Sequence, residues 1–287
     1  MENNFTKTQI VFKETKKIFL EKLDIYSPEE INNIIYWGME SIFQVTKVQI
    51  LSDVSIKTTK KWKMFIEKML NYYPIQYFLQ ESYFYKHIFF VNENVLIPRP
   101  ETEIIIEKII AKYPLKDQKL TILDLGTGSG CLAISLALLY PNADVFAIDI
   151  SEKALDVAKK NAQIHQTKNI HFECLDMQKI KDFQKKFDII VSNPPYICEK
   201  EKTEMSKNVL DYEPHLALFV PDNNALVFYE AIANWGNLYL AEKGNILIEI
   251  NQNLPQETIN VFQKQSFSNI ILHKDYFDNH RIIEIQK

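Results

Sequence analysis

TILDLGTGSGCLAISLALLY, residues 121–140, is the stretch of this sequence that decides its fold. An apolar run that suits a β-strand, TILDL, leads into a loop that contains Gly126, Gly128 and Gly130, and the residues from 131 onward suit a helix. The whole chain of 287 residues has only six glycines, so half of them lie in this loop. Glycine allows positive φ and lets backbone N–H groups approach a ligand closely. The stretch therefore predicts a strand–loop–helix unit that holds a ligand.

The glycine loop matches neither of two common phosphate-binding motifs. No Gly-Lys-Ser/Thr follows it, which excludes a P-loop. Its third glycine comes two residues after the second, whereas the dinucleotide pattern G-x-G-x-x-G requires three. The next predicted strand ends at Asp149, close to the roughly 20-residue offset at which a carboxylate receives ribose hydroxyls. The simpler alternatives are an ordinary turn at the glycines and a helix N-cap at Asp149, although Ser151 suits the cap better.

The regions on either side of this stretch have different patterns. The first 80 residues contain helical patterns, such as the capping sequence Ser27-Pro28-Glu29-Glu30 followed by apolar residues at helical spacing. Residues 82–97 are rich in aromatic and β-branched side chains, which predicts a β-hairpin that turns at Asn92-Glu93-Asn94. We therefore predict a small helical domain over 1–80, a hairpin linker over 81–98 and an α/β domain over 99–287.

The α/β domain is predicted to contain seven strands that alternate with helices, which is typical of a sheet covered on both faces. The last two strands leave no room for a helix between them, so they should form an antiparallel pair. The strands are expected at 120–125, 144–150, 170–175, 187–192, 245–250, 269–275 and 281–286. Helices are expected near 100–112, 130–139, 152–165, 224–241 and 255–265.

Composition narrows the class of protein. With 46% apolar and 24% charged residues, the chain suits a globular fold and excludes collagen-like, disordered and disulfide-scaffold classes. A net charge of −4 provides no general attraction to nucleic acid. The three cysteines, Cys131, Cys174 and Cys198, form no C-x-x-C pair, which favours reduced thiols and no metal site. We expect a cytoplasmic protein without a signal peptide or membrane span, since the apolar run 131–140 is too short to cross a bilayer.

A second motif follows the predicted strand 187–192, at the sheet edge where open α/β folds bind ligands. It is Asn193-Pro194-Pro195-Tyr196, in which the two prolines fix φ and remove two backbone donors. The Asn193 amide and the Pro194 carbonyl can accept the two hydrogens of a planar –NH2 group. Tyr196 can stack on that plane. The motif thus favours an amide or exocyclic amine as substrate, and a rigid turn without chemistry is the alternative.

The glycine loop and Asp149 together resemble the S-adenosylmethionine site of the Rossmann-like class I methyltransferases. In that family the loop cradles the methionine part and the second-strand carboxylate binds the ribose. Asn-Pro-Pro-Tyr resembles the signature of methyltransferases that act on adenine N6, cytosine N4 or glutamine amides. The third strand ends at Cys174-Leu175-Asp176-Met177, which sets a polar and a large apolar side chain at the edge where adenine would bind.

Three further stretches resemble the bacterial release-factor glutamine N5-methyltransferase family: IPRPETE at 97–103, YEPHLAL at 212–218 and DYFDNHR at 275–281. The resemblance implies S-adenosylmethionine as cofactor, S-adenosylhomocysteine as product, and methylation of the glutamine in the Gly-Gly-Gln motif of peptide chain release factors. It implies cofactor contacts from Gly126, Thr127, Gly128, Ser129, Gly130, Asp149, Met177 and Asn193. It also implies a glutamine-binding turn formed by Asn193, Pro194, Pro195 and Tyr196, with Asn193, Pro194 and Tyr196 as catalytic residues.

The sequence is also compatible with other functions. A DNA or RNA amino-methyltransferase would need a basic surface, for which only the lysine-rich tract 57–63 is a candidate. A methyltransferase acting on a ribosomal-protein glutamine and a nucleotide-binding module without activity are further alternatives. Arg99 suits either the rim of the site or a structural ion pair, and the long insertion 197–223 could face the substrate or close over it. We expect a monomer whose helical domain binds the release factor.

Overall fold

The computed structural model describes residues 5–114 and 119–287, which form two compact units. The first unit combines Met1–Gln80 with Met205–Tyr212, and the second combines Glu81–Glu204 with Glu213–Lys287. The chain therefore passes between the units three times, after Gln80, after Glu204 and after Tyr212. The short segment 205–212 lies within the predicted insertion but belongs to the helical unit.

The first unit is mainly helical, as its sequence predicts. Its elements are β1 (Phe5–Lys7), α1 (Thr8–Lys22), α2 (Pro28–Phe43), α3 (Lys47–Leu51), β2 (Ser55–Lys57), α4 (Lys60–Leu70), α5 (Ile75–Leu79) and α9 (Lys207–Tyr212). The capping box at the start of α2 is confirmed, because the Ser27 side chain accepts from the Glu30 N–H and the Glu30 carboxylate accepts from the Ser27 N–H. The antiparallel pair β1–β2 was not predicted, because three-residue strands are too short to show an alternating pattern.

Helix α9 packs within the helical unit through aromatic and polar contacts. The Tyr212 hydroxyl donates to the Asn71 carbonyl at 2.7 Å, and the Tyr212 ring meets that of Tyr73 edge-on at 5.1 Å between centroids. The Lys207 ammonium lies 4.8 Å from the centroid of the Tyr72 ring, a cation–π contact. These contacts hold a segment that is distant in sequence against the residues that follow α4.

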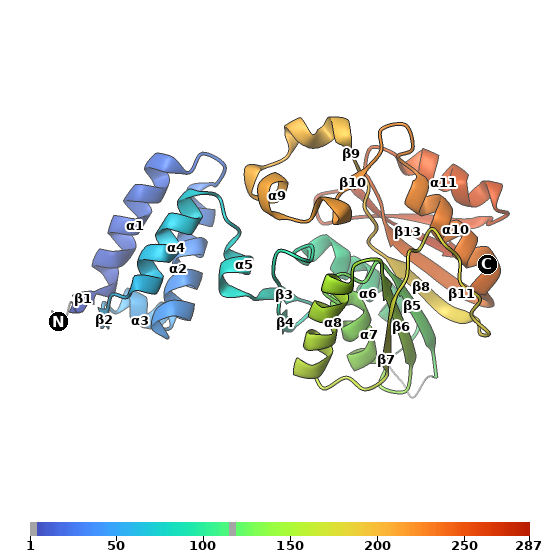
Figure 1. Cartoon of the computed structure of the whole chain (residues 1–287), viewed down its shortest axis with the longest axis horizontal. Helices are drawn as coiled ribbons and strands as arrows, with labels where there is room; N and C mark the ends of the chain where they lie inside the picture. Colours follow the sequence, from blue (N-terminus) through green and yellow to red (C-terminus); the bar gives the residue numbers. More distant parts are fainter. Residues whose placement is uncertain (1–4, 115–118) are drawn as a thin grey trace. The chain divides into compact units, whose positions relative to one another are not determined.

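The second unit contains a seven-stranded sheet in the order β12-β13-β11-β8-β5-β6-β7 (Figure 1). The strand β13 (His280–Gln286) pairs antiparallel with both of its neighbours, whereas the other pairings are parallel. Both the seven strands and the single antiparallel strand were predicted, and they are confirmed. The other strands are β5 (Thr121–Leu125), β6 (Asp144–Asp149), β7 (Ile170–Cys174), β8 (Phe187–Ser192), β11 (Leu240–Glu249) and β12 (Asn269–Lys274).

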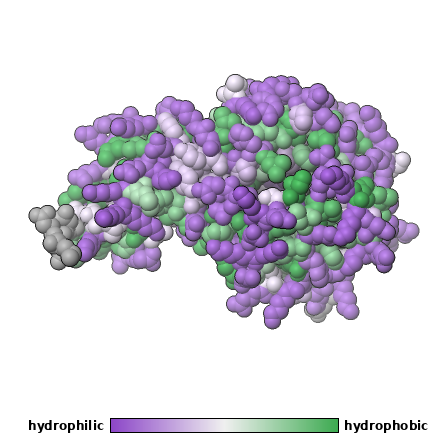
Figure 2. All heavy atoms as spheres, in the orientation of Figure 1, coloured by the Kyte–Doolittle hydropathy of each residue, from purple (hydrophilic) through white to green (hydrophobic). Residues whose placement is uncertain are grey.

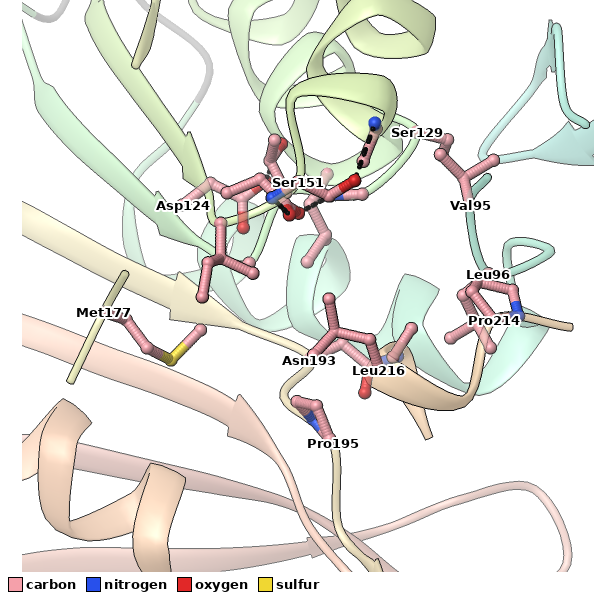
Figure 3. A pocket seen from close by; sticks show the side chains of 18 of the residues that line it. Val95, Leu96, Asp124, Ser129, Ser151, Met177, Asn193, Pro195, Pro214 and Leu216 are labelled. Atoms are coloured by element: carbon pink, nitrogen blue, oxygen red, sulfur yellow. Dashed lines mark hydrogen bonds between the residues drawn. The ribbon is translucent and has the colours of Figure 1, made fainter. Parts of the chain in front are cut away.

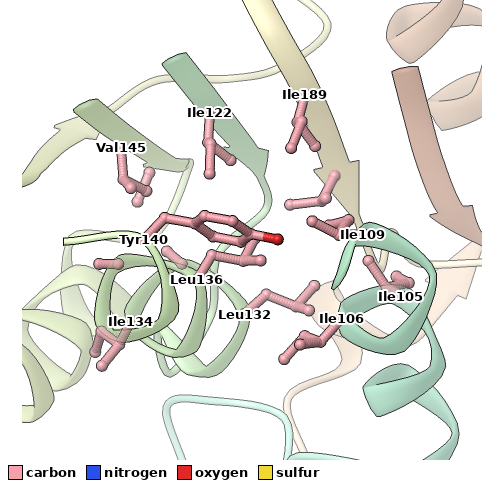
Figure 4. Packing of buried hydrophobic residues seen from close by; sticks show 14 of the residues in the cluster. Ile105, Ile106, Ile109, Ile122, Leu132, Ile134, Leu136, Tyr140, Val145 and Ile189 are labelled. Carbon is pink, nitrogen blue, oxygen red and sulfur yellow. The ribbon is translucent and has the colours of Figure 1, made fainter. Parts of the chain in front are cut away.

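Helices cover both faces of this sheet. One buried cluster joins the sheet to α6 (Glu103–Lys112) and α7 (Cys131–Leu139), and contains the side chains of Ile105, Leu136 and Tyr140 (Figure 4). The helix α8 (Glu152–Ile164) contributes Ala162 to the same cluster. A second cluster joins the opposite face to α10 (Val227–Tyr239) and α11 (Pro255–Lys264). The apolar faces of the helices thus hold the sheet and leave its carboxyl edge free for a site.

The predicted hairpin exists, but its turn was predicted at the wrong position. The strands β3 (Ser82–Phe84) and β4 (His87–Phe89) are joined by Tyr85 and Lys86, which have φ values of 40° and 68°. Two-residue turns of this kind usually contain asparagine or glycine, so the local sequence does not reveal this one. The Glu103 carboxylate of α6 accepts from the Tyr85 N–H at 3.0 Å and helps to hold the turn. Asn92-Glu93-Asn94 forms a separate turn after the hairpin, in which the Val95 N–H donates to the Asn92 carbonyl.

The predicted insertion is an irregular region with short elements. These are β9 (Ile197–Cys198), η2 (Glu199–Glu204), α9, η3 (His215–Ala217) and β10 (Phe219–Val220), and β9 pairs parallel with β10. The strand β11 begins five residues before its predicted start, and its pairing with β8 is irregular between Leu240 and Asn245. The 3-10 turn η1 (Pro100–Thr102) leads into α6.

The surface of the second unit is mixed in polarity. On the face drawn in Figure 2, hydrophilic atoms surround smaller patches of hydrophobic atoms. Within residues 5–114 and 119–287, no helix combines the length and apolar character that crossing a membrane requires.

Candidate functional site

A cavity opens at the carboxyl edge of the sheet, where β5, β6, β7 and β8 end (Figure 3). Each of these strands delivers one predicted motif to the cavity, as expected where parallel strands end at a common edge. The segments before α6 and around η3 line it as well. Its predicted site residues are Gly126, Thr127, Gly128, Ser129, Asp149, Met177, Asn193 and Pro195.

The glycine loop adopts the left-handed backbone that its composition predicted. Gly126, Gly128 and Gly130 have φ values of 76°, 54° and 82°. A Cβ at Gly128 would meet nothing within 4 Å, so the bare backbone here faces open space. A Cβ at Gly130 would lie 2.9 Å from Ile134 Cδ1 and 3.1 Å from Ala158 Cβ. Gly130 therefore has a packing reason to be glycine, whereas Gly128 leaves room for a ligand.

Asp149, the last residue of the neighbouring strand β6, forms a hydrogen bond to the glycine loop. One carboxylate oxygen accepts from the Gly128 N–H at 2.8 Å, and the other accepts from the Ser151 N–H at 2.9 Å. Burial raises the pKa of Asp149, and these backbone donors oppose that rise. Each oxygen keeps a further lone pair, so the carboxylate can still accept from ligand hydroxyls. Ser151 caps α8 by accepting from the Ala154 N–H, as predicted.

Asp124, which the sequence reasoning did not single out, lies beneath the loop. It is 1% exposed, and its Oδ2 accepts from the Thr127 hydroxyl at 2.7 Å. Its Oδ1 is buried without a hydrogen-bond partner in the structure. Burial raises the pKa of Asp124 to about 7. A buried acceptor without a partner is costly, so a donor from a ligand would be favoured here.

Met177 lines the cavity, and Asn161 lies behind it and supports the glycine loop. The Met177 carbonyl accepts from the Trp235 indole N–H at 2.8 Å, and the Met177 methyl would lie 3.0 Å from a Cβ at Gly126. Asn161 of α8 is fully buried and donates to the carbonyls of Phe90 and Ser129, both at 2.9 Å. It thereby ties the linker to the glycine loop. Asn161 was missed because nothing in its local sequence distinguishes it from other helical asparagines.

The Asn-Pro-Pro-Tyr turn is held from behind by polar side chains of other elements. The Asn193 amide nitrogen donates to the Thr102 hydroxyl at 3.0 Å, and that hydroxyl donates to Glu249 Oε2 at 2.6 Å. The Tyr196 hydroxyl donates to Glu249 Oε1 at 2.9 Å. Thr102 also lines the cavity, whereas Glu249 is 1% exposed and lies behind it.

Three predicted site residues are absent from the cavity lining among the described residues, namely Gly130, Pro194 and Tyr196. Pro194 is buried in the turn, and the ring of Tyr196 packs against the second core cluster. The roles assigned to these residues stay predictions.

Arg99 makes an ion pair at the edge of the cavity. Its guanidinium lies 2.5 Å from Glu213 Oε1, and Glu213 Oε2 accepts from the Ile97 N–H at 3.0 Å. Glu213 is buried, while the Arg99 side chain is 31% exposed and also lines the cavity. The ion-pair alternative for Arg99 is thus confirmed, and a role at the rim remains compatible with its position.

The sequence of this chain is similar to those of known proteins over most of its length. The chain is 43% identical to the release factor glutamine methyltransferase of Flavobacterium psychrophilum, and the match covers 96% of this chain and 99% of that protein. The chain belongs to the release factor glutamine methyltransferase family. A second member, from Bacteroides thetaiotaomicron, is 38% identical over 91% of this chain and 94% of its own length.

Membership of this family agrees with the fold. A family model described as a methyltransferase domain matches residues 116–257, which include the glycine loop and the Asn-Pro-Pro-Tyr turn. The solved structure of the Thermus thermophilus 16S rRNA N2 G1207 methyltransferase superposes with a TM-score of 0.52 at 17% identity, over 72% of this chain and 49% of that one. The predicted Rossmann-like methyltransferase fold is therefore confirmed.

Proposed function

We propose that this protein transfers a methyl group from S-adenosylmethionine to the side-chain amide nitrogen of the glutamine in the Gly-Gly-Gln motif of peptide chain release factors. The printed names of its relatives support this substrate, since the similarity extends over nearly the whole chain. The observation that carries the proposal is the hydrogen bonding of Asn193. Because its amide nitrogen is engaged by Thr102, its amide oxygen is left to accept from a substrate –NH2 group.

The residues of the cavity fit the proposed cofactor. S-adenosylmethionine supplies an electrophilic methyl group on a positively charged sulfonium. The open space at Gly128 allows close approach to the backbone, and Asp149 keeps lone pairs for ribose hydroxyls. The unpartnered Asp124 oxygen suits a positively charged donor, and Met177 offers a polarizable apolar surface to an adenine face. These residues, together with the predicted Gly126, Thr127, Ser129, Gly130 and Asn193, are the proposed cofactor contacts.

The proposed reaction needs orientation more than a strong base. A bond forms between the glutamine amide nitrogen and the methyl carbon as the sulfur–carbon bond breaks, and the nitrogen then loses a proton to water. An amide nitrogen is a poor nucleophile because its lone pair is delocalised. Hydrogen bonds from the substrate –NH2 group to Asn193 and to the Pro194 carbonyl would help localise that lone pair. Holding the amide nitrogen in line with the methyl carbon and the sulfur can lower the activation barrier by roughly 7–11 kcal/mol.

A labelling experiment tests the proposal directly. The protein is incubated with S-adenosylmethionine labelled at the methyl group and with purified release factor, DNA or RNA. We expect label on the release factor, and none on a release-factor variant in which the Gly-Gly-Gln glutamine is alanine. Label on nucleic acid with none on protein would contradict the proposal.

Asn193→Ala probes the substrate site in the same assay. It should reduce methyl transfer to background, because the oxygen that accepts from the substrate amide is removed. The dissociation constant for S-adenosylmethionine, measured by calorimetric titration, should rise only modestly, by roughly threefold or less. Turnover close to that of the unaltered protein would exclude the proposed role of Asn193.

A further inference from the structure

A buried relay of hydrogen bonds runs from the cavity into the sheet. It starts at the Asn193 amide nitrogen, passes through the Thr102 hydroxyl at 3.0 Å and ends on Glu249 Oε2 at 2.6 Å. Its members come from three distant segments: the turn after β8, the 3-10 turn η1 and the end of β11. Asn193 and Thr102 belong to two of the sequence motifs described above, but neither motif indicates that its side chain meets the other or Glu249.

The chemistry of the groups gives the relay one direction. A threonine hydroxyl has a single proton to donate, and a carboxylate can only accept. The Thr102 proton therefore goes to Glu249, and the Thr102 oxygen is left to accept from Asn193. The Asn193 nitrogen then faces Thr102, so the Asn193 oxygen faces away from it. Without the carboxylate, Thr102 could donate to Asn193 instead, and the amide would turn round.

Burial and charge maintain this direction. Thr102 and Glu249 are 2% and 1% exposed, so bulk water does not compete for their hydrogen bonds. The other carboxylate oxygen accepts from the Tyr196 hydroxyl at 2.9 Å. Burial and the nearby Glu249 charge raise the pKa of Tyr196 well above its ordinary value, so Tyr196 keeps its proton and remains a donor. Burial raises the pKa of Glu249 and so works against its carboxylate form, whereas the Thr102 and Tyr196 hydrogen bonds and the Arg281 charge favour that form.

We propose that Glu249 is a positioning residue for methyl transfer, which acts through Thr102 to hold the Asn193 amide with its oxygen toward the substrate. This inference rests on the proposed function, because it assumes that Asn193 accepts from the substrate –NH2 group. A turned amide would present its own –NH2 group to that of the substrate. Two donors would then face each other, and the hydrogen bond that helps localise the substrate lone pair would be lost.

The kinetic test uses two substitutions that interrupt the relay at different points. Glu249→Leu removes the acceptor, and Thr102→Val removes the hydroxyl while keeping the shape of the side chain. We expect each to lower kcat on release factor by about tenfold to a hundredfold, a typical effect of a misplaced catalytic group. KM for the release factor and Kd for S-adenosylmethionine should change by less than about threefold, because Asn193 supplies little of either binding surface. Thr102→Ser keeps a hydroxyl at this position, so it should retain most of the kcat of the unaltered protein.

Two further variants separate positioning from general damage to the fold. Thr258→Val is the matched control. Thr258 is fully buried in α11, and its hydroxyl donates to the carbonyl of Leu254, the N-cap residue of the same helix. This variant should lower the melting temperature as much as Thr102→Val without lowering kcat. The double variant Glu249→Leu/Thr102→Val should lose no more kcat than Thr102→Val alone, because both changes interrupt one relay. Additive losses would overturn the inference, and so would normal kcat in Thr102→Val.

A spectroscopic readout keeps the inference testable apart from activity. With selective 15N-asparagine labelling, the Asn193 side-chain –NH2 signal is identified by its loss in Asn193→Ala. One of its protons should exchange slowly with water in the unaltered protein and in Thr102→Ser, but rapidly in Glu249→Leu and Thr102→Val. If this pattern holds and no release factor is methylated, the proposed function fails and the orienting relay stands. If the exchange is the same in all four proteins, the relay is excluded even where methylation occurs.

Discussion

Asp124 is the residue whose ionisation should affect stability most clearly. Its pKa is raised from 3.8 to about 7 by burial, so the folded protein keeps a proton that the unfolded chain releases. A raised carboxyl pKa means that stability is highest below the unfolded pKa and falls as pH rises toward the folded one. The loss between pH 4 and pH 7 should be on the order of 3 kcal/mol.

The variant Asp124→Asn isolates this effect, because asparagine does not titrate and can still accept from Thr127. Urea unfolding at a series of pH values should show that the unaltered protein loses stability relative to the variant as pH rises from 4 to 7. Equal pH dependence of the two proteins would mean that Asp124 ionises normally in the folded state.

Arg99 and Glu213 offer a second prediction at the level of single residues. Arg99→Met leaves the buried Glu213 carboxylate without its counter-ion, which should lower the free energy of unfolding by about 2 kcal/mol. The double variant Arg99→Met/Glu213→Gln should recover most of that loss, because glutamine can still accept from the Ile97 N–H. Denaturant titration measures the free energy of unfolding of the single and the double variant. If Arg99 acts only through the ion pair, the double variant should also recover methyl transfer, and low activity in a stable double variant would instead indicate a role at the rim.

At the level of elements, the strand–loop–helix unit separates two uses of glycine. Gly130→Ala should destabilise the fold by about 2–4 kcal/mol, because the new methyl group would clash with Ile134 and Ala158 and φ is positive. Gly128→Ala should cost only about 1 kcal/mol, since its Cβ would meet nothing within 4 Å.

Ligand affinity should show the opposite order for these two variants. The methyl group of Gly128→Ala would project where a ligand approaches, so the Kd for S-adenosylmethionine should rise at least about tenfold. In Gly130→Ala the same constant, measured well below the melting temperature, should change less. Calorimetric titration measures the loss of affinity in each variant, and thermal unfolding measures the loss of stability. If one variant has the larger loss in both measurements, the two glycines do not have separate uses.

The elements also show what a sequence can and cannot predict. Strands such as β5 and β8 were predicted closely because their apolar runs are bounded by turn residues, and the antiparallel pairing of β13 followed from the short connection before it. The hairpin turn at Tyr85 was missed because its support comes from α6 rather than from its neighbours in sequence.

The same distinction holds for the candidate site. The residues at strand ends were predicted because parallel strands bring their carboxyl ends together. The roles of Glu249 and Thr102 were not predicted, since their hydrogen bond joins residues 147 positions apart. Thr102 lies in the stretch 97–103 that resembles the family, but that stretch gives no role to its hydroxyl. The partnerless oxygen of Asp124 depends on burial, which only the assembled fold creates.

At the level of the whole molecule, the division into units predicts how segments can be exchanged between relatives. A chimera that takes only residues 1–80 from the Flavobacterium psychrophilum protein would pair a foreign helical segment with the resident segment 205–212. Its melting temperature should be a few degrees below that of a chimera that takes both segments, given roughly 2 °C per kcal/mol for a chain of this size. Calorimetry measures the difference, and equal melting temperatures would show that α9 contributes nothing to the helical unit.

The three passages of the chain between the units also bear on how the protein can evolve. Tyr212 and Lys207 contact Asn71, Tyr72 and Tyr73, although the residues next to them in sequence belong to the other unit. A mutation at one of these positions is therefore tolerated or rejected according to residues more than a hundred positions away. The helical unit is encoded by two separated stretches of the gene, for residues 1–80 and 205–212. A change in its surface that suits a new partner therefore has to keep the two segments compatible with each other.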